Sequence, residues 1–290
     1  MERTFDSVAK LHNIEKSYTN FTLSLPELCI PKGFSTALIG ENGAGKTTLL
    51  KILTGLNDEY SGDIEYFEGL REKHLIIDRI GYTSSTNYFN PSWKLENISE
   101  FSPYIYDSFN SDTFYKILNE TDMINVKQSI SQMSDGMKMK TMIAATLARK
   151  TEFLIMDEPA SPLDPIMREK LCDLIRAYIR QGNGSNSVLF STHNISDMEN
   201  VTDYAIFMAD GMVVEQGFVE DLKEKYYLIK GEPSHAKILK EFLIGFTESP
   251  YNCQGLCLID DLDKLAGMDV TVETPTLNQI SVGIMKGGAK

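Results

Sequence analysis

The chain has 290 residues, enough for one large domain or two smaller ones. Its apolar content of 42% and charged content of 24% fit a globular protein, and its formal charge of -13 disfavours nonspecific binding to nucleic acid or to an anionic lipid surface. The beginning "MERTFDSVAK" is not followed by the apolar stretch of a signal peptide, and no apolar run approaches the roughly 20 residues that span a bilayer. We therefore expect any membrane role to depend on a partner.

The first predicted elements surround a glycine-rich stretch. Residues 34–40, "FSTALIG", form a short apolar run that predicts a buried strand. The sequence "KTTLLKILTG" then predicts a helix that Gly55 terminates. Between them, "GENGAGKTT" at 40–48 matches G-x-x-x-x-G-K-[ST] in the strand-to-helix context of a phosphate-binding loop. A chance glycine-rich turn is the alternative, and the flanking strand and helix argue against it.

The residue types of this loop suit a nucleotide. Glycines let backbone N–H groups surround phosphate oxygens at a helix N-terminus. Lys46 supplies positive charge to the β- and γ-phosphates, and the Thr47 hydroxyl can ligate Mg²⁺. Thr48 can reach the α-phosphate. The residues expected to bind nucleotide here are Asn42, Gly43, Gly45, Lys46, Thr47 and Thr48.

The segment 96–149 is mostly helical in character. Within it, Ser134 in "SQMSDGMKMK" predicts a helix N-cap, and Asp135 suits the positive end of the helix dipole. Gly136 costs about 1 kcal/mol relative to alanine inside a helix, which indicates that something approaches the backbone there. One face of this last helix is expected to carry Met139, Met142, Ile143, Thr146 and Leu147.

Two further apolar runs, "FLIMDE" at 153–158 and "SVLFST" at 187–192, predict buried strands of a mostly parallel sheet covered on both faces. Asp157 ends the first of them, where a carboxylate can hold the Mg²⁺ shell, and Glu158 can act as a general base on water. A surface Asp-Glu pair is the alternative. His193 follows the second run and could reach the γ-phosphate, orient the water or cap the loop after it.

The remainder of the chain changes character. "YAIFMADGMVVEQG" predicts a hairpin that turns at Asp210 and Gly211. Beyond residue 226, short strands and a helix at 234–246 predict a small α+β unit. The four cysteines, of which Cys253 and Cys257 are close in sequence, are interpreted as reduced thiols because no histidine nearby completes a metal site.

Taken together, "GENGAGKTT", "MSDGMKMK", "FLIMDEPASPLD" and "STH" resemble, in order and spacing, the motifs of an ABC-transporter ATPase subunit over about residues 1–225. The resemblance implies that Ser134 and Gly136 contact the γ-phosphate of ATP held by the other subunit, and that Asp135 between them belongs to the same signature in trans. Asp164 resembles the aspartate that links the two sites across the dimer. The family resemblance also favours a catalytic role for His193 over a role as a loop cap.

Two further positions, Tyr18 and Ser85, lie outside these four motifs. Tyr18 looks like the aromatic residue that stacks on adenine in this family, and Phe21 is a rival. Ser85 stands where family members usually carry a glutamine that touches Mg²⁺ and water, and its hydroxyl is too short to replace that side chain fully. The S-x-G-M-K form of the signature and the ending "ETPTLNQISVGIMKGG" resemble ABC-2 type exporters of peptides and antimicrobials, such as phenol-soluble-modulin or bacitracin exporters.

The resemblance implies an α/β P-loop ABC ATPase fold: a RecA-like core, an antiparallel β part and a helical subdomain at about 88–148, with residues 226–290 as an α+β appendage. It implies an ATPase using ATP and Mg²⁺, a homodimer or heterodimer of ATPase subunits, and a separate transmembrane permease that holds it at the cytoplasmic face of the membrane. No nucleic-acid partner is expected. A soluble ribosome- or DNA-associated ABC ATPase and an importer ATPase are the alternatives.

Overall fold

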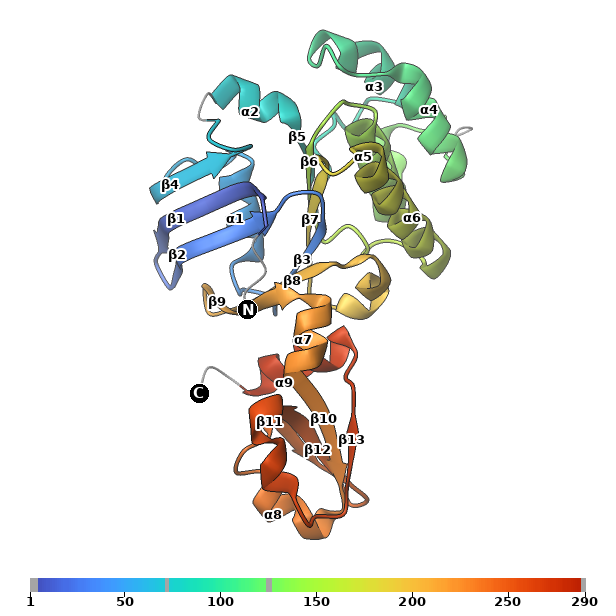
Figure 1. Cartoon of the computed structure of the whole chain (residues 1–290). Coiled ribbons are helices and arrows are strands. Elements are labelled where there is room, and N and C mark those ends of the chain that lie inside the picture. Colours follow the sequence, from blue (N-terminus) through green and yellow to red (C-terminus); the bar gives the residue numbers. More distant parts are fainter. Residues whose placement is uncertain (1–4, 71–72, 124–126, 288–290) are drawn as a thin grey trace.

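The computed structural model describes residues 5–70, 73–123 and 127–287. These residues form three sheets, with helices between and around them (Figure 1). Small parts of the predicted segments lie outside the described residues: 1–4 and 71–72 of the ATPase part, 124–126 of the helical part and 288–290 of the appendage. No described helix combines the length and apolar character needed to cross a bilayer.

The central sheet has six strands in the order β5-β6-β7-β3-β8-β9. Its members are β3 (Ser35–Ile39), β5 (Ile80–Thr83), β6 (Phe153–Asp157), β7 (Ser187–Thr192), β8 (Tyr204–Ala209) and β9 (Met212–Phe218). All pairs are parallel except β8 with β9. The three apolar runs predicted as strands are confirmed as β3, β6 and β7.

The hairpin of β8 and β9 turns at Asp210 and Gly211, as predicted. Both residues have left-handed backbones, with φ of 48° and 80°. Such a turn matches the twist of the flanking strands and favours the Asp-Gly pair.

Alternation along the buried strands directs their side chains to two different cores. In β6, Phe153 and Ile155 pack toward α1 (Lys46–Leu53), while Leu154 and Met156 pack toward α5 (Asp135–Leu147) and α6 (Pro165–Gln181). Both faces of the sheet are therefore covered, which explains why the strands are apolar throughout. Thr54 caps α1 and Gly55 follows with φ +70°, so the predicted helix end is confirmed.

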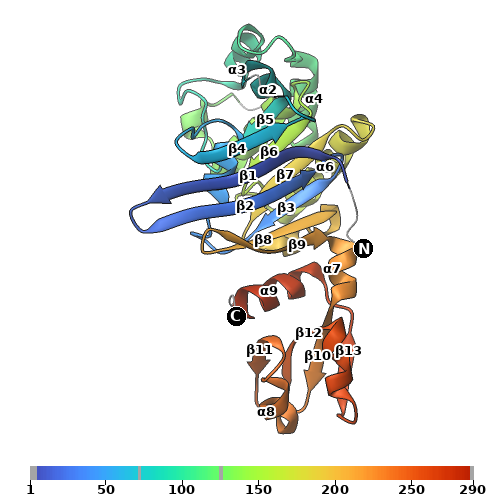
Figure 2. The same cartoon turned by 60° about the vertical axis from the view of Figure 1, so that its left-hand side comes forward.

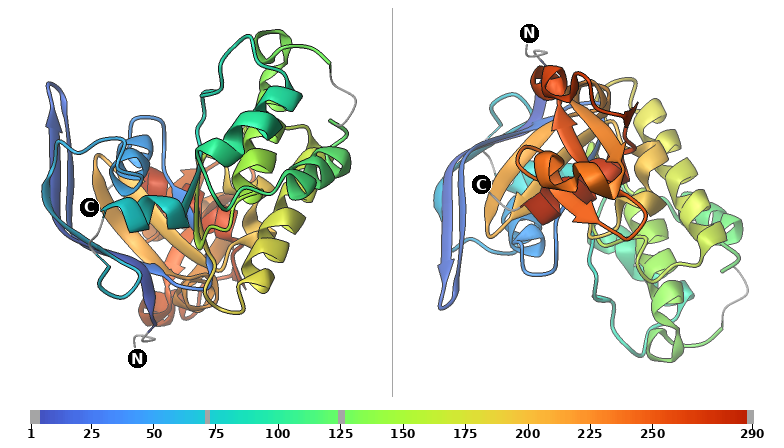
Figure 3. Two further views of the ribbon diagram at one scale, coloured as in Figure 1. Left: turned by 90° about the horizontal axis from the view of Figure 1, so that it is seen from above. Right: turned by 90° about the horizontal axis from the view of Figure 1, so that it is seen from below.

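A second sheet is antiparallel, with the order β2-β1-β4. It consists of β1 (Ser7–Tyr18), β2 (Phe21–Pro31) and β4 (Ser61–Tyr66). Its buried leucines and isoleucines join the core that contains α1. Seen from above, this sheet and the helical part lie on opposite sides of the molecule (Figure 3).

The helical part follows β5 and packs around its own core. Its α-helices are α3 (Leu95–Phe101), α4 (Ser111–Glu120) and α5, and α2 (Lys73–Arg79) precedes β5. Helix α5 is buried over more of its surface than the single predicted face. The predicted residues Met139, Met142, Ile143 and Thr146 are buried, and Leu147 is partly buried. Thr141, Ala144 and Ala145, outside that face, are buried as well. The reason is that α5 lies between the central sheet and the core of the helical part.

The C-terminal residues form a third, antiparallel sheet with the order β11-β12-β10-β13. Its elements are β10 (Tyr226–Gly231), β11 (Ile244–Glu248), β12 (Cys253–Leu258), β13 (Val270–Glu273), α8 (Ala236–Leu239) and α9 (Leu277–Gly287). α7 (Val219–Lys225) connects it to β9. Cys253 and Cys257 lie on β12 as buried free thiols.

The helix predicted at 234–246 is wrong over its second half. α8 ends at Leu239, and Ile244 already belongs to β11, which pairs with β12. Gly245 adopts φ +61° at an irregularity in that pairing, a conformation that a helix cannot contain. Apolar residues that would fit one helix face instead pack on both faces of the sheet, Ile244 toward α9 and Phe246 toward α8.

Helix α9 joins the third sheet to the rest of the protein (Figure 2). Leu277 and Ile280 are fully buried in the same core as Ile195 and Met198. The Glu199 carboxylate accepts hydrogen bonds from the first backbone N–H groups of α9, those of Leu277 at 2.8 Å and Asn278 at 3.3 Å. Because free N–H groups and the helix dipole attract a carboxylate, this contact stabilises the helix end.

We predict that Glu199→Ala lowers the free energy of unfolding by about 1–2 kcal/mol, because it removes this cap and leaves two N–H groups unpaired. Thermal and urea unfolding measure the change. Glu59→Ala is the matched control, since it removes the same type of side chain, which is 85% exposed at that position, and its ion pair with Lys16 contributes little. Equal stability of the two variants would show that the cap does not hold α9.

Candidate active site

The phosphate loop requires Gly43 for backbone freedom and Gly45 for space as well. Gly43 and Gly45 have φ of 90° and 104°. A Cβ at Gly45 would lie 2.8 Å from the ring of Phe21 and 3.2 Å from Leu23. Glycine alone satisfies both limits, so the loop can curl tightly between β3 and α1.

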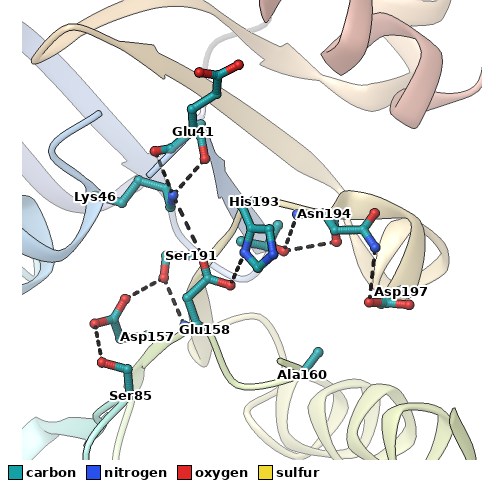
Figure 4. Close-up of polar contacts among 12 residues, drawn as sticks. Glu41, Lys46, Ser85, Asp157, Glu158, Ala160, Ser191, His193, Asn194 and Asp197 are labelled. Carbon is teal, nitrogen blue, oxygen red and sulfur yellow. Dashed lines mark hydrogen bonds and ion pairs between the residues drawn. The ribbon is translucent and has the colours of Figure 1, made fainter. Parts of the chain in front are cut away.

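Lys46 begins α1 and is nearly buried. Its ammonium donates to the carbonyl oxygens of Gly40 at 2.6 Å and Glu41 at 3.2 Å, and lies 3.6 Å from Glu158 Oε1 (Figure 4). Burial lowers the pKa of Lys46, and the carboxylates of Glu158 and Asp157 oppose that shift. A cation held in this way is placed to meet an anion that enters the loop.

Asp157 is 1% exposed and is surrounded by hydroxyl groups. It accepts hydrogen bonds from Thr47 at 3.0 Å, from Ser191 at 2.6 Å and from Ser85 at 3.3 Å. Carboxylate and hydroxyl oxygens are the ligands that Mg²⁺ prefers, and Mg²⁺ at nucleotide sites takes most other ligands from phosphates and water. Thr47 and Asp157 therefore fit the magnesium role, whereas Ser85 contacts the carboxylate from an exposed position.

Glu158 lies between two other functional candidates. Its Oε1 faces Lys46, and its Oε2 lies 2.9 Å from Nδ1 of His193. The backbone of Glu158 has φ +50°, which is uncommon for a residue other than glycine. The loop after His193 is capped by Asn194, whose side chain accepts from Ser196 N–H. Asn194, and not His193, therefore caps this loop, and the imidazole of His193 contacts Glu158.

A cleft of about 810 Å³ opens beside these groups. Its lining includes Asn42 of the phosphate loop, Ser85, Glu158 and His193, and also Asp135 at the start of α5. One wall of the cleft thus comes from the central sheet and the other from the helical part.

The signature stretch starts α5. Ser134 is exposed and caps the helix, because its Oγ accepts from the N–H of Met137 at 3.2 Å. Asp135 forms an ion pair with Lys138 at 3.0 Å. Gly136 has a reason within its own chain, since a Cβ there would lie 2.8 Å from the carbonyl oxygen of Pro162. The sequence did not reveal this contact, because Pro162 is distant along the chain.

Asp164 caps α6 by accepting from the N–H of Met167 at 3.1 Å. This hydrogen bond lowers the pKa of the Asp164 carboxyl. The cap was missed from the sequence, although Asp before a proline at the first helical position is a strong N-terminal signal.

Tyr18 and Phe21 face each other across the turn between β1 and β2, with ring centroids 6.2 Å apart. Tyr18 is 48% exposed, whereas Phe21 is partly buried beneath Gly45. The more exposed ring is the better placed of the two to stack on a planar ligand.

Ser191 is a functional candidate that sequence reasoning missed. It is buried at the end of β7, donates to Asp157 and accepts from the N–H of Glu158 at 2.9 Å. Alternation in β7 could have found it, because Ser191 follows Leu189 on the face of the sheet that carries Asp157.

Comparison with known proteins agrees with this geometry. The ABC transporter family profile matches residues 23–161. The lantibiotic transport ATP-binding protein SrtF of Streptococcus pyogenes is 34% identical over 224 residues, covering 75% of this chain and 95% of SrtF. The ribose import ATP-binding protein RbsA of Caldanaerobacter subterraneus is 28% identical over 232 residues, covering 75% and 46%.

A structure of the ATP-binding cassette MJ0796 with ADP and Pi superimposes with a TM-score of 0.61 at 23% identity, covering 72% of this chain and 98% of that one. That likeness establishes the ABC ATPase fold predicted from the motifs. Together with the family match and the similarity to SrtF, it shows that the chain belongs to the ATP-hydrolysing, ATP-binding subunits of ABC transporters.

Proposed function

We propose that this chain powers an exporter of amphipathic or antimicrobial peptides. In this proposal two ATPase subunits enclose two ATP molecules and drive separate permease subunits at the cytoplasmic face of the membrane. The similarity to a lantibiotic transport protein supports this direction and cargo. Import is the second candidate, supported by the similarity to a ribose import protein.

The observation that carries the chemistry is the position of Glu158 between Lys46 and His193. A water in the cleft attacks the γ-phosphorus, its proton passes to the Glu158 carboxylate, and ADP leaves with the electron pair of the broken P–O bond. Lys46 and the phosphate-loop N–H groups bind the phosphates, and His193 orients Glu158. Thr47 and Asp157 would hold Mg²⁺, and the bound ion would supply positive charge to neutralise the developing charge on the phosphates.

We assign Tyr18 to adenine and leave Phe21 as its support. We assign Ser134, Asp135 and Gly136 to the ATP of the other subunit, with Asp164 near the dimer interface. Ser134 is exposed at the start of α5, and the N–H groups of a helix start favour a phosphate.

We predict that Glu158→Gln keeps ATP binding and loses hydrolysis by roughly 10²–10⁴-fold, because the amide cannot accept the proton. Phosphate release and nucleotide binding are measured on the same preparation. Glu152→Gln serves as the control, because Glu152 precedes β6 at the end of the strand away from Glu158 and is paired with Arg79. Near-normal turnover by Glu158→Gln would remove this residue from the role.

The assignment of Ser134 to the opposite subunit predicts complementation. Lys46→Ala removes the charge at the phosphates and Ser134→Arg blocks the signature, so each homodimer should be inactive. In a mixed dimer both defects fall in one site and the other site is intact. Single-turnover phosphate release should therefore return on mixing.

Two different tags verify that the mixed dimer has formed. A mixed dimer that binds ATP but releases no phosphate would contradict the cross-subunit assignment, unless both sites must act together. A dimer with Glu158→Gln in one chain only tests that exception.

A groove of about 350 Å³ between the central sheet and the helical part supports a membrane partner. Leu56, Ile77 and Tyr88 line it and are 65%, 46% and 49% exposed. At the groove, the Arg149 guanidinium stacks on Tyr106 at 3.6 Å, and its Nε is buried without a hydrogen-bond partner among the described residues. An apolar segment of the permease fits this lining, which Arg149 and Tyr106 complete.

We predict that Arg149→Ala weakens co-purification with a multi-span membrane protein from detergent-solubilised membranes, while ATP binding is retained. Arg176→Ala on α6 is the control, because that arginine pairs with Asp173 on the helix surface. Equal recovery of the membrane protein with both variants would place the permease contact elsewhere.

A further inference from the structure

The hydroxyl of Ser191 connects the two carboxylate residues that follow β6. Its proton is directed to Asp157 Oδ1 at 2.6 Å, and its oxygen accepts the backbone N–H of Glu158 at 2.9 Å (Figure 4). A hydroxyl has a single proton, and the incoming N–H occupies the side of the oxygen that faces Glu158. The hydroxyl proton of Ser191 therefore points away from Glu158, toward the Asp157 carboxylate.

This short contact orients the Asp157 side chain. With Oδ1 held by Ser191, the nearer contact of Thr47 and the contact of Ser85 fall on Oδ2. The two oxygens thus have different nearest donors: Oδ1 lies closest to Ser191 of β7, with Thr47 at 3.2 Å, and Oδ2 lies closest to Thr47 of the phosphate loop. Because a hydrogen bond to a charged group is short and strong, Ser191 limits rotation of the carboxylate.

The same hydroxyl holds the backbone of Glu158. That residue has φ +50°, a conformation that costs free energy for any residue with a Cβ and persists only where the surroundings enforce it. The N–H of Glu158 is one of the groups through which the surroundings act, and Ser191 is its acceptor.

We infer that Ser191 is a positioning residue that aligns the Asp157 carboxylate for the metal and the Glu158 backbone for the base. The inference rests on the roles proposed above for these two residues. Ser191 itself contacts neither nucleotide nor water in this scheme. It acts through its neighbours. Although Ser191 begins the "STH" stretch, the resemblance gave a role only to His193 in that stretch.

The test compares Ser191→Ala with Ser187→Ala. Ser187 lies on the same strand, is also fully buried, and uses its hydroxyl to accept the N–H of Gly33 at 2.9 Å, away from the site. Both changes remove one buried hydroxyl and leave a smaller side chain, so loss of packing is matched. Ser191→Thr keeps the hydroxyl and is the rescue variant.

We expect Ser191→Ala to lower kcat about 10-fold, as loss of a hydrogen bond to a charged group does, with little change in KM for ATP. Mn²⁺ binding to the ATP-loaded protein, followed by electron paramagnetic resonance, should need several-fold more metal. Metal-free ATP binding should stay unchanged. Hydrogen exchange should become faster at the Glu158 amide, and Ser191→Thr should restore each value.

The inference is overturned if Ser191→Ala matches Ser187→Ala in Mn²⁺ half-saturation, kcat and exchange at Glu158. If Ser191→Thr is unstable, the comparison of the two alanine variants still decides. Failure of the proposed function is separate: Glu158→Gln would then hydrolyse ATP like the unaltered protein, while Mn²⁺ binding and amide exchange continue to report on Ser191.

Discussion

The buried Asp157 carboxylate imposes the main constraint on the site. A charge that is 1% exposed requires donors, because an unpaired buried carboxylate costs several kcal/mol. Its donors come from α1, β7 and the segment after β5, through Thr47, Ser191 and Ser85. These three segments are distant in sequence, so satisfying one charge fixes the phosphate loop, the central sheet and the edge of the helical part relative to one another.

Glu158 depends on this arrangement. The residue leaves the end of β6 with a left-handed backbone, and its side chain then lies between Lys46 and His193. An extended backbone would continue the strand and direct the side chain elsewhere. The unfavourable conformation thus directs the two adjacent acidic side chains to different places. Asp157 remains among hydroxyl groups at the end of the strand, and Glu158 faces the cleft.

Local patterns predicted the parts of this architecture that local physics determines. The apolar runs gave β3, β6 and β7, and the phosphate loop with its helix followed from its motif. Contacts between distant segments were not predictable: the carbonyl of Pro162 against Gly136 and the Ser191 hydroxyl against Asp157 depend on tertiary packing. The helix predicted at 234–246 failed because an apolar pattern suits a helix or a strand until its neighbours are known.

The same core that surrounds the site reaches the C-terminal unit. The segment after His193 contains Ile195, Met198 and Glu199, and all three contact or share a core with α9. Leu277 and Ile280 of α9 are fully buried in that core, so moving α9 away exposes apolar surface and leaves the Glu199 carboxylate without its N–H donors. A displacement of His193 and its loop must therefore either carry α9 along or accept both costs. Since α9 in turn packs against β11 and β12, a continuous series of packing contacts runs from the third sheet to the loop that follows His193, the residue that contacts Glu158.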